Sequence, residues 1–258
     1  MLSIDQILLQ YPEYLRIHKE SILKEYLQYK ILNIIYNSKY TTKLVFLGGT
    51  ALRIIYGNTR FSENLDFDNL GLNQEQWSEL SNILKTNLEL EGIEVEIRTI
   101  TQKAFRIKVK ISRLLYNTGL SPLPEQKILI QLDTTPQYFD YTTEKPFLNK
   151  FEIFTRIFTV PKNLLLSQKI YAAVNRNRIM GRDYFDIVFL NGIGAQPNYL
   201  YLKQHLQIQN QGELKDFLLE KTKDFDFNQL AQDVKPFLIN PNDVQKVRFF
   251  RDYLKSQL

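Results

Sequence analysis

Residues that could bind a phosphate group and a metal ion gather in the segment FLGGTALRIIYGNTRFSENLDFD, which spans residues 46–68. Gly48 and Gly49 follow an apolar run, and the pattern from Thr50 to Tyr56 predicts a short helix. Two glycines before a helix let the backbone approach a phosphate closely, and the first turn of a helix offers free N–H groups to an anion. The glycine pair alone could equally be an ordinary strand-to-helix turn, so its neighbours decide the interpretation.

Amide and acidic side chains alternate in the strand expected soon after this helix. Asn64, Asp66 and Asp68 stand at every second position. Because alternate residues of a strand point to the same face, the three polar groups should line up while the intervening apolar residues face a core. A phosphate-binding turn next to an acidic strand is what metal-dependent nucleotide chemistry requires.

The composition restricts which metal the chain could bind. It contains no cysteine, and its two histidines, His18 and His205, lie far apart in the sequence. A disulfide framework and a thiolate zinc site are thereby excluded, and a histidine metal site or a Ser-His-Asp triad is disfavoured. A divalent ion would be held by carboxylates, which favours Mg²⁺ or Mn²⁺. The net charge of +5 is compatible with nucleic-acid binding but does not establish it alone.

A second group of charged residues lies in the later segment SQKIYAAVNRNRIMGRDYFDIVFL. Lys169 and Arg176 fall on one helical face, because seven residues make nearly two turns. After the glycine, Asp183 and Asp186 are neighbours three residues apart on the next helix, and Arg182 can pair with Asp186 four residues on.

The order of the strand and helix patterns predicts two domains. The 258 residues suffice for one large or two modest domains, and 44% hydrophobic with 24% charged residues is ordinary for a globular protein. Strand patterns recur until Val160 and helical patterns fill the remainder, so we expect a mixed α/β domain over residues 1–160 and a helical domain over 161–258. The expected helices lie within 3–36 and over 50–56 and 74–90, and the expected strands are 43–48, 64–68, 93–99, 104–112, 127–134 and 151–159.

Neither a membrane span nor a secretory leader is indicated. The chain has no long apolar run, and its N-terminal MLSIDQILLQYPEY carries acidic residues too early for a signal peptide. We therefore expect a cytoplasmic protein that makes no use of a membrane.

Together, the two charged segments resemble the AbiEii/AbiGii toxin family of phage-defence and toxin–antitoxin systems, within the nucleotidyltransferase superfamily of DNA polymerase beta. In that family a Gly-Gly or Gly-Ser pair, a short helix and an Asp-x-Asp strand are followed by Lys-Leu-x-Ala…Arg and Arg-Asp-x-x-Asp segments. GGTALRIIYG with RFSENLDFD is similar to the first part, and the second part is matched in order by Lys169, Ala172, Arg176, Arg182, Asp183 and Asp186. The resemblance covers residues 40–190 and implies an α/β (α+β) fold: a polymerase-beta-like nucleotidyltransferase domain with a mixed sheet, followed by a helical domain.

The resemblance also implies an activity and its ligands. An NMP would pass from a nucleoside triphosphate to an acceptor such as the 3′ end of a tRNA, and an antitoxin encoded nearby would be the protein partner. Asp66 and Asp68 would hold Mg²⁺ or Mn²⁺, and Asp133 would either join them as a third carboxylate or cap the turn after its strand. The catalytic residues would be Asp66, Lys169 and Asp183. The nucleotide would be bound by Gly48, Gly49, Thr50, Arg60, Ser62 and Arg176.

One position departs from the family pattern. The family reads Ser-Glu-Asp-Leu-Asp-Phe where this chain reads Ser-Glu-Asn-Leu-Asp-Phe, so Asn64 replaces the first aspartate. An amide brings no charge to a metal ion. Asp68 could supply the missing carboxylate, the protein could be a catalytically attenuated nucleotide-binding protein, or the fold could serve as a scaffold without catalysis.

Several side chains also have a structural alternative. Lys169 and Arg176 could belong to a solvated helix face, and Ser62 could accept the nucleotide itself or hold a turn. Arg106, Lys108 and Lys110 share one face of their strand and could receive an RNA backbone or simply face water.

Overall fold

The computed structural model describes residues 1–102 and 104–257. Within it the chain divides into two compact units, and the second takes a short piece of the N-terminal half. The first unit comprises Met1–Ile55 and Phe61–Thr159, and the second comprises Tyr56–Arg60 and Val160–Leu258.

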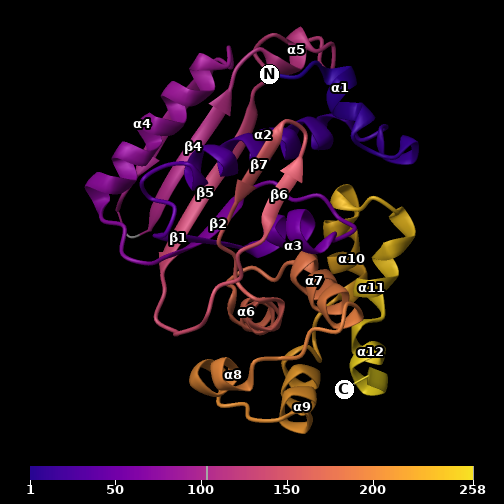
Figure 1. Ribbon diagram of the computed structural model, residues 1–258. Helices are drawn as coiled ribbons and strands as arrows, with labels where there is room; N and C mark the ends of the chain where they lie inside the picture. Colours follow the sequence, from indigo (N-terminus) through magenta and orange to yellow (C-terminus); the bar gives the residue numbers. More distant parts are fainter. Residues whose placement is uncertain (103, 258) are drawn as a thin grey trace. The chain divides into compact units, whose positions relative to one another are not determined.

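A five-stranded mixed sheet forms the centre of the first unit, with the strand order β1-β2-β5-β4-β3 (Figure 1). Strands β2 and β5 run parallel, and every other neighbouring pair is antiparallel. Apolar and polar residues alternate along β2, β3, β4 and much of β5, so these strands have one face for a core and one for polar groups, whereas β1 is apolar throughout. The strands are β1 (Leu44–Leu47), β2 (Leu65–Asn69), β3 (Val95–Ile100), β4 (Phe105–Ile111) and β5 (Ile128–Pro136).

Two long helices, α2 (Lys19–Tyr36) and α4 (Gln74–Leu90), pack on the apolar side of the sheet. Helix α4 begins at Asn73, whose side chain accepts a hydrogen bond from the backbone N–H of Gln76 in a capping box. Four of its apolar residues recur at helical spacing and are fully buried, namely Trp77, Leu80, Leu84 and Leu88. The polar face of the sheet therefore remains for the acidic and basic residues of the strands.

Shorter elements complete the first unit. They are α1 (Ile4–Leu9), η1 (Glu13–Leu15), α3 (Gly48–Tyr56), α5 (Leu114–Asn117) and the hairpin strands β6 (Phe147–Lys150) and β7 (Ile153–Arg156). The hairpin replaces the single strand expected over 151–159, because Phe151 adopts a left-handed backbone conformation with φ of 59° and reverses the chain. A non-glycine residue in that conformation gives no signal in the sequence.

The second unit is helical. An aromatic core holds it together: Tyr184 makes edge-on contacts with Phe227 and Phe250, and these two rings stack on each other. Its helices are α6 (Lys162–Asn175), α7 (Gly181–Gly192), α8 (Tyr199–Leu206), α9 (Gln211–Lys221), α10 (Phe227–Val234), η2 (Lys235–Phe237), η3 (Pro241–Val244), α11 (Gln245–Arg248) and α12 (Phe250–Gln257).

The α/β fold class predicted from the sequence is confirmed, and one detail of the acidic strand was wrong. Strand β2 begins at Leu65, so Asn64 precedes it and the alternation argument holds only for Asp66 and Asp68. None of the helices in the described part of the chain is both long and apolar enough to cross a bilayer.

Gly181, the first residue of α7, sets how closely that helix approaches α10. A Cβ added at Gly181 would lie 1.9 Å from the backbone oxygen of Leu230. We expect Gly181→Ala to lower the free energy of unfolding by at least the roughly 1–3 kcal/mol typical of overpacking, because a backbone oxygen cannot rotate away. Thermal and urea unfolding followed by circular dichroism would measure this.

Gly192, the last residue of the same helix, provides the control. A Cβ there would meet nothing within 4 Å. Gly192→Ala should leave stability unchanged or raise it by about 0.4–1 kcal/mol through the unfolded state. Equal effects of the two substitutions would show that the α7–α10 contact is not as tight as described.

Candidate active site

The turn between β1 and α3 presses the backbone against an acidic side chain. Gly48 has a φ of +80°, and a Cβ built on it would lie 2.3 Å from Oδ2 of Asp66. Leu47, the residue before it, pairs with Asp66 across the antiparallel strands β1 and β2. Only glycine fits this position, because any side chain would be strained in the backbone and would collide with the carboxylate.

A second carboxylate stands beside Asp66 on the next strand. Asp66 and Asp133 are register partners on the parallel strands β2 and β5, so their side chains project from the same face of the sheet. Both are half-buried. Asp133 is also the register partner of Arg106 on β4 and forms an ion pair with it, and it accepts a 2.6 Å hydrogen bond from Nε2 of Gln131. The row is thus two carboxylates followed by a guanidinium.

Asp68 has a different environment from Asp66. It is only 4% exposed, and its Oδ2 accepts hydrogen bonds from the Tyr141 hydroxyl at 2.6 Å and from Nε2 of Gln137 at 2.7 Å. Burial and the neighbouring Asp68 charge raise the pKa of Tyr141 well above its ordinary value, so the phenol stays a donor. Asp68 therefore tethers the segment that follows β5.

The carboxylates of Asp66 and Asp133 suit a divalent cation that is held by few protein ligands. Among residues 1–102 and 104–257, no three histidine or acidic side chains are placed together as a metal-binding group, so Asp66, Asp68 and Asp133 do not form one. Two adjacent carboxylates on one sheet face remain, Asp66 and Asp133. Mg²⁺ is commonly bound by one or two carboxylates together with substrate phosphates, and hard oxygen donors suit it.

The other residues predicted to bind a nucleotide in the first unit are engaged through structural contacts. Thr50 is fully buried, and its hydroxyl donates to the backbone oxygen of Asn64. The backbone oxygen of Ser62 accepts a 2.9 Å hydrogen bond from Nε2 of Gln28. At the start of α3 the backbone, rather than a hydroxyl, is the part of the turn suited to a phosphate.

The charged residues of the second unit form a buried cluster. Asp183 and Asp186 are both 0% exposed. Nζ of Lys169 lies 2.8 Å from Oδ2 of Asp186 and 3.3 Å from Oδ1 of Asp183. Arg60 is 2% exposed and binds both oxygens of Asp186, each at 2.7 Å. Its guanidinium is therefore a partner of Asp186 within the cluster.

Two further side chains complete this cluster. Nδ2 of Asn58 donates to Oδ1 of Asp186 at 2.9 Å. Nε of Arg176 lies 3.0 Å from Oδ2 of Asp183, and the Arg176 side chain is 41% exposed. Burial alone would raise the pKa of Asp186, but the attraction of Arg60 and Lys169 outweighs it and holds that pKa well below its ordinary value.

Sequence reasoning missed the partner of Asp186. We expected Arg182 to pair with it along one helix, and this expectation was wrong: Asp186 is bound by Arg60, 126 residues away in the sequence, and by Lys169. The Arg106–Asp133 pair was also missed, since alternation gives the face of each strand but not the register between strands.

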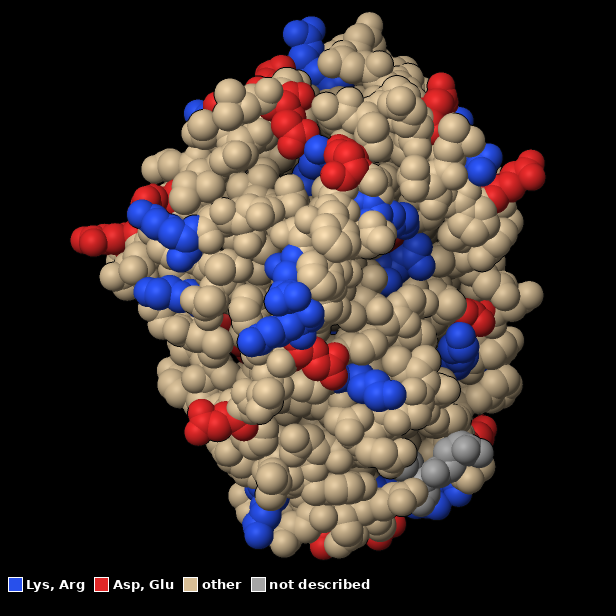
Figure 2. Space-filling view, in the orientation of Figure 1, with Lys and Arg blue, Asp and Glu red and all other residues tan. Residues whose placement is uncertain are grey.

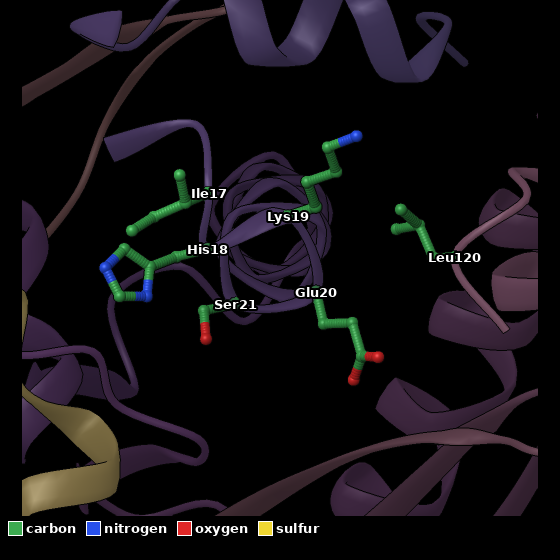
Figure 3. A pocket seen from close by; sticks show the side chains of 6 residues that line it. All are labelled: Ile17, His18, Lys19, Glu20, Ser21 and Leu120. Carbon is green, nitrogen blue, oxygen red and sulfur yellow. The ribbon is translucent and has the colours of Figure 1, made fainter. Parts of the chain in front are cut away.

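A surface hollow of about 330 Å³ near the start of α2 contains none of the motif residues. The side chains of residues 17–21 point in different directions from the start of the helix rather than toward a common point, and Leu120 comes from a separate segment (Figure 3). On the face shown in Figure 2, basic groups are separated by acidic and uncharged ones. Neither feature marks a ligand site by itself. The hollow is lined by Ile17, His18, Lys19, Glu20, Ser21 and Leu120.

Asp186 tests the energetics of the buried cluster. Asp186→Asn should cost about 3–5 kcal/mol of unfolding free energy, because it leaves the buried Arg60 and Lys169 without their shared carboxylate. Because the pKa of Asp186 is lower in the folded protein than its ordinary value of 3.8, the Asp186 carboxylate stabilises the fold at pH values above 3.8. This contribution is lost as the pH falls from 3.8 through the pKa of the folded state. The melting temperatures of wild type and variant should therefore converge below about pH 3.8.

Glu220→Gln is the control, since Glu220 forms an exposed pair with Lys223 in the same unit. It should leave the melting temperature unchanged. An Asp186→Asn variant as stable as wild type at pH 7 would contradict the described ion pairs.

Comparison with known proteins identifies the family of the chain and structures with a similar fold. The family model for the nucleotidyl transferase AbiEii toxin of type IV toxin–antitoxin systems matches residues 30–253. The fold is similar to JHP933 from Helicobacter pylori, with 17% identity, a TM-score of 0.54 and 93% of each chain covered. It is also similar to MenT4, the nucleotidyltransferase toxin Rv2826c from Mycobacterium tuberculosis H37Rv, with 16% identity, a TM-score of 0.59 and 99% of this chain and 89% of that chain covered. No curated protein sequence matches. The chain belongs to the AbiEii family of nucleotidyltransferase toxins.

Proposed function

We propose that this toxin transfers a nucleoside monophosphate from a nucleoside triphosphate to an RNA hydroxyl, such as the 3′ end of a tRNA, and needs Mg²⁺ or Mn²⁺ to do so. The observation that carries the proposal is the arrangement of Gly48, Asp66 and Asp133. A glycine turn at a helix start lies against one carboxylate, and a second carboxylate is its register partner on the next strand.

The start of α3, the two carboxylates and Arg106 each have a role in the proposed reaction. The backbone N–H groups at the start of α3 bind triphosphate oxygens. Asp66 and Asp133 hold the divalent ion, which when bound offsets the negative charge of the phosphates. The acceptor hydroxyl releases its proton to solvent as its oxygen bonds to the α-phosphorus, the bond to the leaving phosphate oxygen breaks, and pyrophosphate departs. Arg106 keeps the Asp133 carboxylate oriented through their ion pair.

In the buried cluster of the second unit, the cations that we propose for phosphate binding are Lys169 and Arg176. We assign Asp183 a positioning role, because it is fully buried and binds both cations. Arg60 acts through Asp186 rather than on the nucleotide. With 41% of its side chain exposed, Arg176 is the member of the cluster best suited to meet a phosphate from solvent.

An RNA acceptor suits a basic chain with a sequence pI of about 9.1. Nucleoside triphosphates and tRNA place the reaction in the cytoplasm, and family membership implies an antitoxin that restrains it. MenT4 is described as a nucleotidyltransferase toxin, which agrees with a toxin acting by nucleotide transfer.

The metal-binding assignment predicts a difference among three aspartates. Asp66→Asn and Asp133→Asn should each lower transfer by on the order of 10²–10³, the range for losing one preorganised electrostatic contact. Asp68→Asn should retain most of the activity and instead lower stability, because it weakens a charged hydrogen bond to Tyr141, worth about 1.5–3 kcal/mol. Labelled triphosphate incorporation into total RNA, with thermal unfolding in parallel, measures both effects.

Glu63→Gln is the matched control, an exposed acid on the same chain segment that pairs with Lys24. It should transfer at the wild-type rate. Full Mg²⁺-dependent transfer by Asp66→Asn would refute the site, and an inactive but stable Asp68→Asn would restore Asp68 as a metal ligand.

A second function is favoured by Asn64, namely a catalytically attenuated nucleotide-binding protein on the same fold. Asn64 lies just before β2, and its backbone oxygen accepts the Thr50 hydroxyl. An amide in place of a carboxylate lowers the ligand charge by one unit and offers one good acceptor oxygen where a carboxylate has two. Weak metal binding would then slow the reaction while leaving triphosphate binding in place.

Asn64→Asp distinguishes the two functions. If Asp66 and Asp133 already suffice, as we expect, the substitution should change transfer by less than about tenfold, equivalent to 1.4 kcal/mol. A many-fold larger rise would identify the natural protein as attenuated. Triphosphate affinity in Mg²⁺, measured by calorimetry for both proteins, separates a gain in binding from a gain in turnover.

A further inference from the structure

The β6–β7 hairpin has one buried and one open face. Strand β7 packs on α2, and the inward side chains Leu148, Ile153 and Thr155 are at most 6% exposed. Nδ2 of Asn37 donates to the Thr155 hydroxyl at 3.2 Å and fixes this side. The opposite side chains of the two strands point to solvent.

Three of the outward side chains form a stack, which we call the aromatic platform: Phe147, Phe154 and Arg156. The two rings are nearly parallel, with an interplanar angle of 9° and centroids 4.8 Å apart. The guanidinium carbon of Arg156 lies 4.7 Å from the Phe147 centroid. Although the rings contact each other, Phe147 is 48% and Phe154 is 68% exposed. A flat surface made of two stacked rings and a guanidinium is thus presented to water.

The chemistry of the platform fits an unpaired base. Aromatic rings and guanidinium planes are the side chains on which unpaired bases stack, and arginine also attracts the phosphates. The outward positions of the two strands are completed by Asn149, so they include an amide and a cation and no acidic residue. A partner protein would need apolar surface around the rings, whereas the neighbouring outward groups are polar.

The platform is connected to the candidate active site within the first unit. Three residues after β7, Thr159 forms a parallel bridge with Phe46, and its hydroxyl donates to the Phe46 backbone oxygen at 2.8 Å. Phe46 lies two residues before Gly48 on β1. The hairpin is therefore anchored to the strand that leads into the phosphate-binding turn.

We propose that the aromatic platform is a binding surface for single-stranded RNA, on which an unpaired base stacks against Phe154 while Arg156 contacts the backbone. The choice of RNA rests on the proposed function, in which the acceptor is an RNA. Stacking is tolerant of base identity, so the surface would bind unpaired nucleotides near an RNA end without reading a sequence.

The test is the binding of labelled single-stranded oligo(A) and oligo(U) of about ten nucleotides, a length within the usual range for such surfaces. Binding is measured by fluorescence anisotropy without triphosphate and with EDTA, so that no nucleotide transfer can occur during the measurement. Phe154→Ala should weaken binding by about 5- to 150-fold, the range for losing one stacked base. Phe154→Trp should bind at least as well as wild type, and Phe154→Leu should bind as weakly as the alanine variant, since only a flat ring stacks.

Leu90→Ala serves as the control, because Leu90 is 80% exposed on α4 and lies outside the platform. It should bind RNA as wild type does. Unchanged binding by a folded Phe154→Ala, wild-type binding by Phe154→Leu, or equal binding of duplex RNA would each overturn the proposal. Each of these outcomes concerns RNA binding only and does not bear on nucleotide transfer. Failure of the proposed function would instead be seen in the transfer assay, as activity that does not depend on Asp66.

Discussion

The contact between Gly48 and Asp66 constrains the candidate active site on β2 and β5. A glycine loses more conformational entropy on folding than any other residue, and its left-handed conformation here brings backbone against a carboxylate. In return, the N-terminal turn of α3 and an acidic side chain face the same small volume without a side chain between them. A phosphate and a divalent ion need this proximity, since each offsets the charge of the other.

The register between strands places a second carboxylate, Asp133, beside Asp66. The parallel pairing of β2 with β5 sets Asp66 beside Asp133, and the antiparallel pairing of β4 sets Arg106 beside Asp133. Because side chains alternate, a slip of one residue in β5 would turn Asp133 toward α2 and α4 and expose Leu132 or Thr134 in its place. The apolar face beneath therefore fixes the chemistry above it.

Local signals in the sequence were enough to predict the elements but not their partners. Helix α4 spans the predicted residues 74–90, and a capping residue and apolar residues at helical spacing mark it locally. The burial of Arg60 could not be foreseen, since its partner Asp186 lies 126 residues away. The tether on Asp68 was missed for the same reason, because Tyr141 belongs to a loop without periodicity. The order of the motifs indicated the family, while pairings across the fold required the structure.

In the buried cluster, such pairings give similar charged residues different surroundings. Three cations, Arg60, Lys169 and Arg176, face two carboxylates, which leaves one positive charge in excess (3 − 2 = +1). Desolvation makes buried ion pairs poor contributors to stability, but they fix one arrangement of the groups. The two fully buried aspartates hold the buried cations in place. Of the three cations, Arg176 is the one whose positive charge an approaching ligand can reach from solvent, because 41% of its side chain is exposed. A phosphate that approaches this cluster would meet a preorganised cation rather than a flexible one, which lowers the entropic cost of binding.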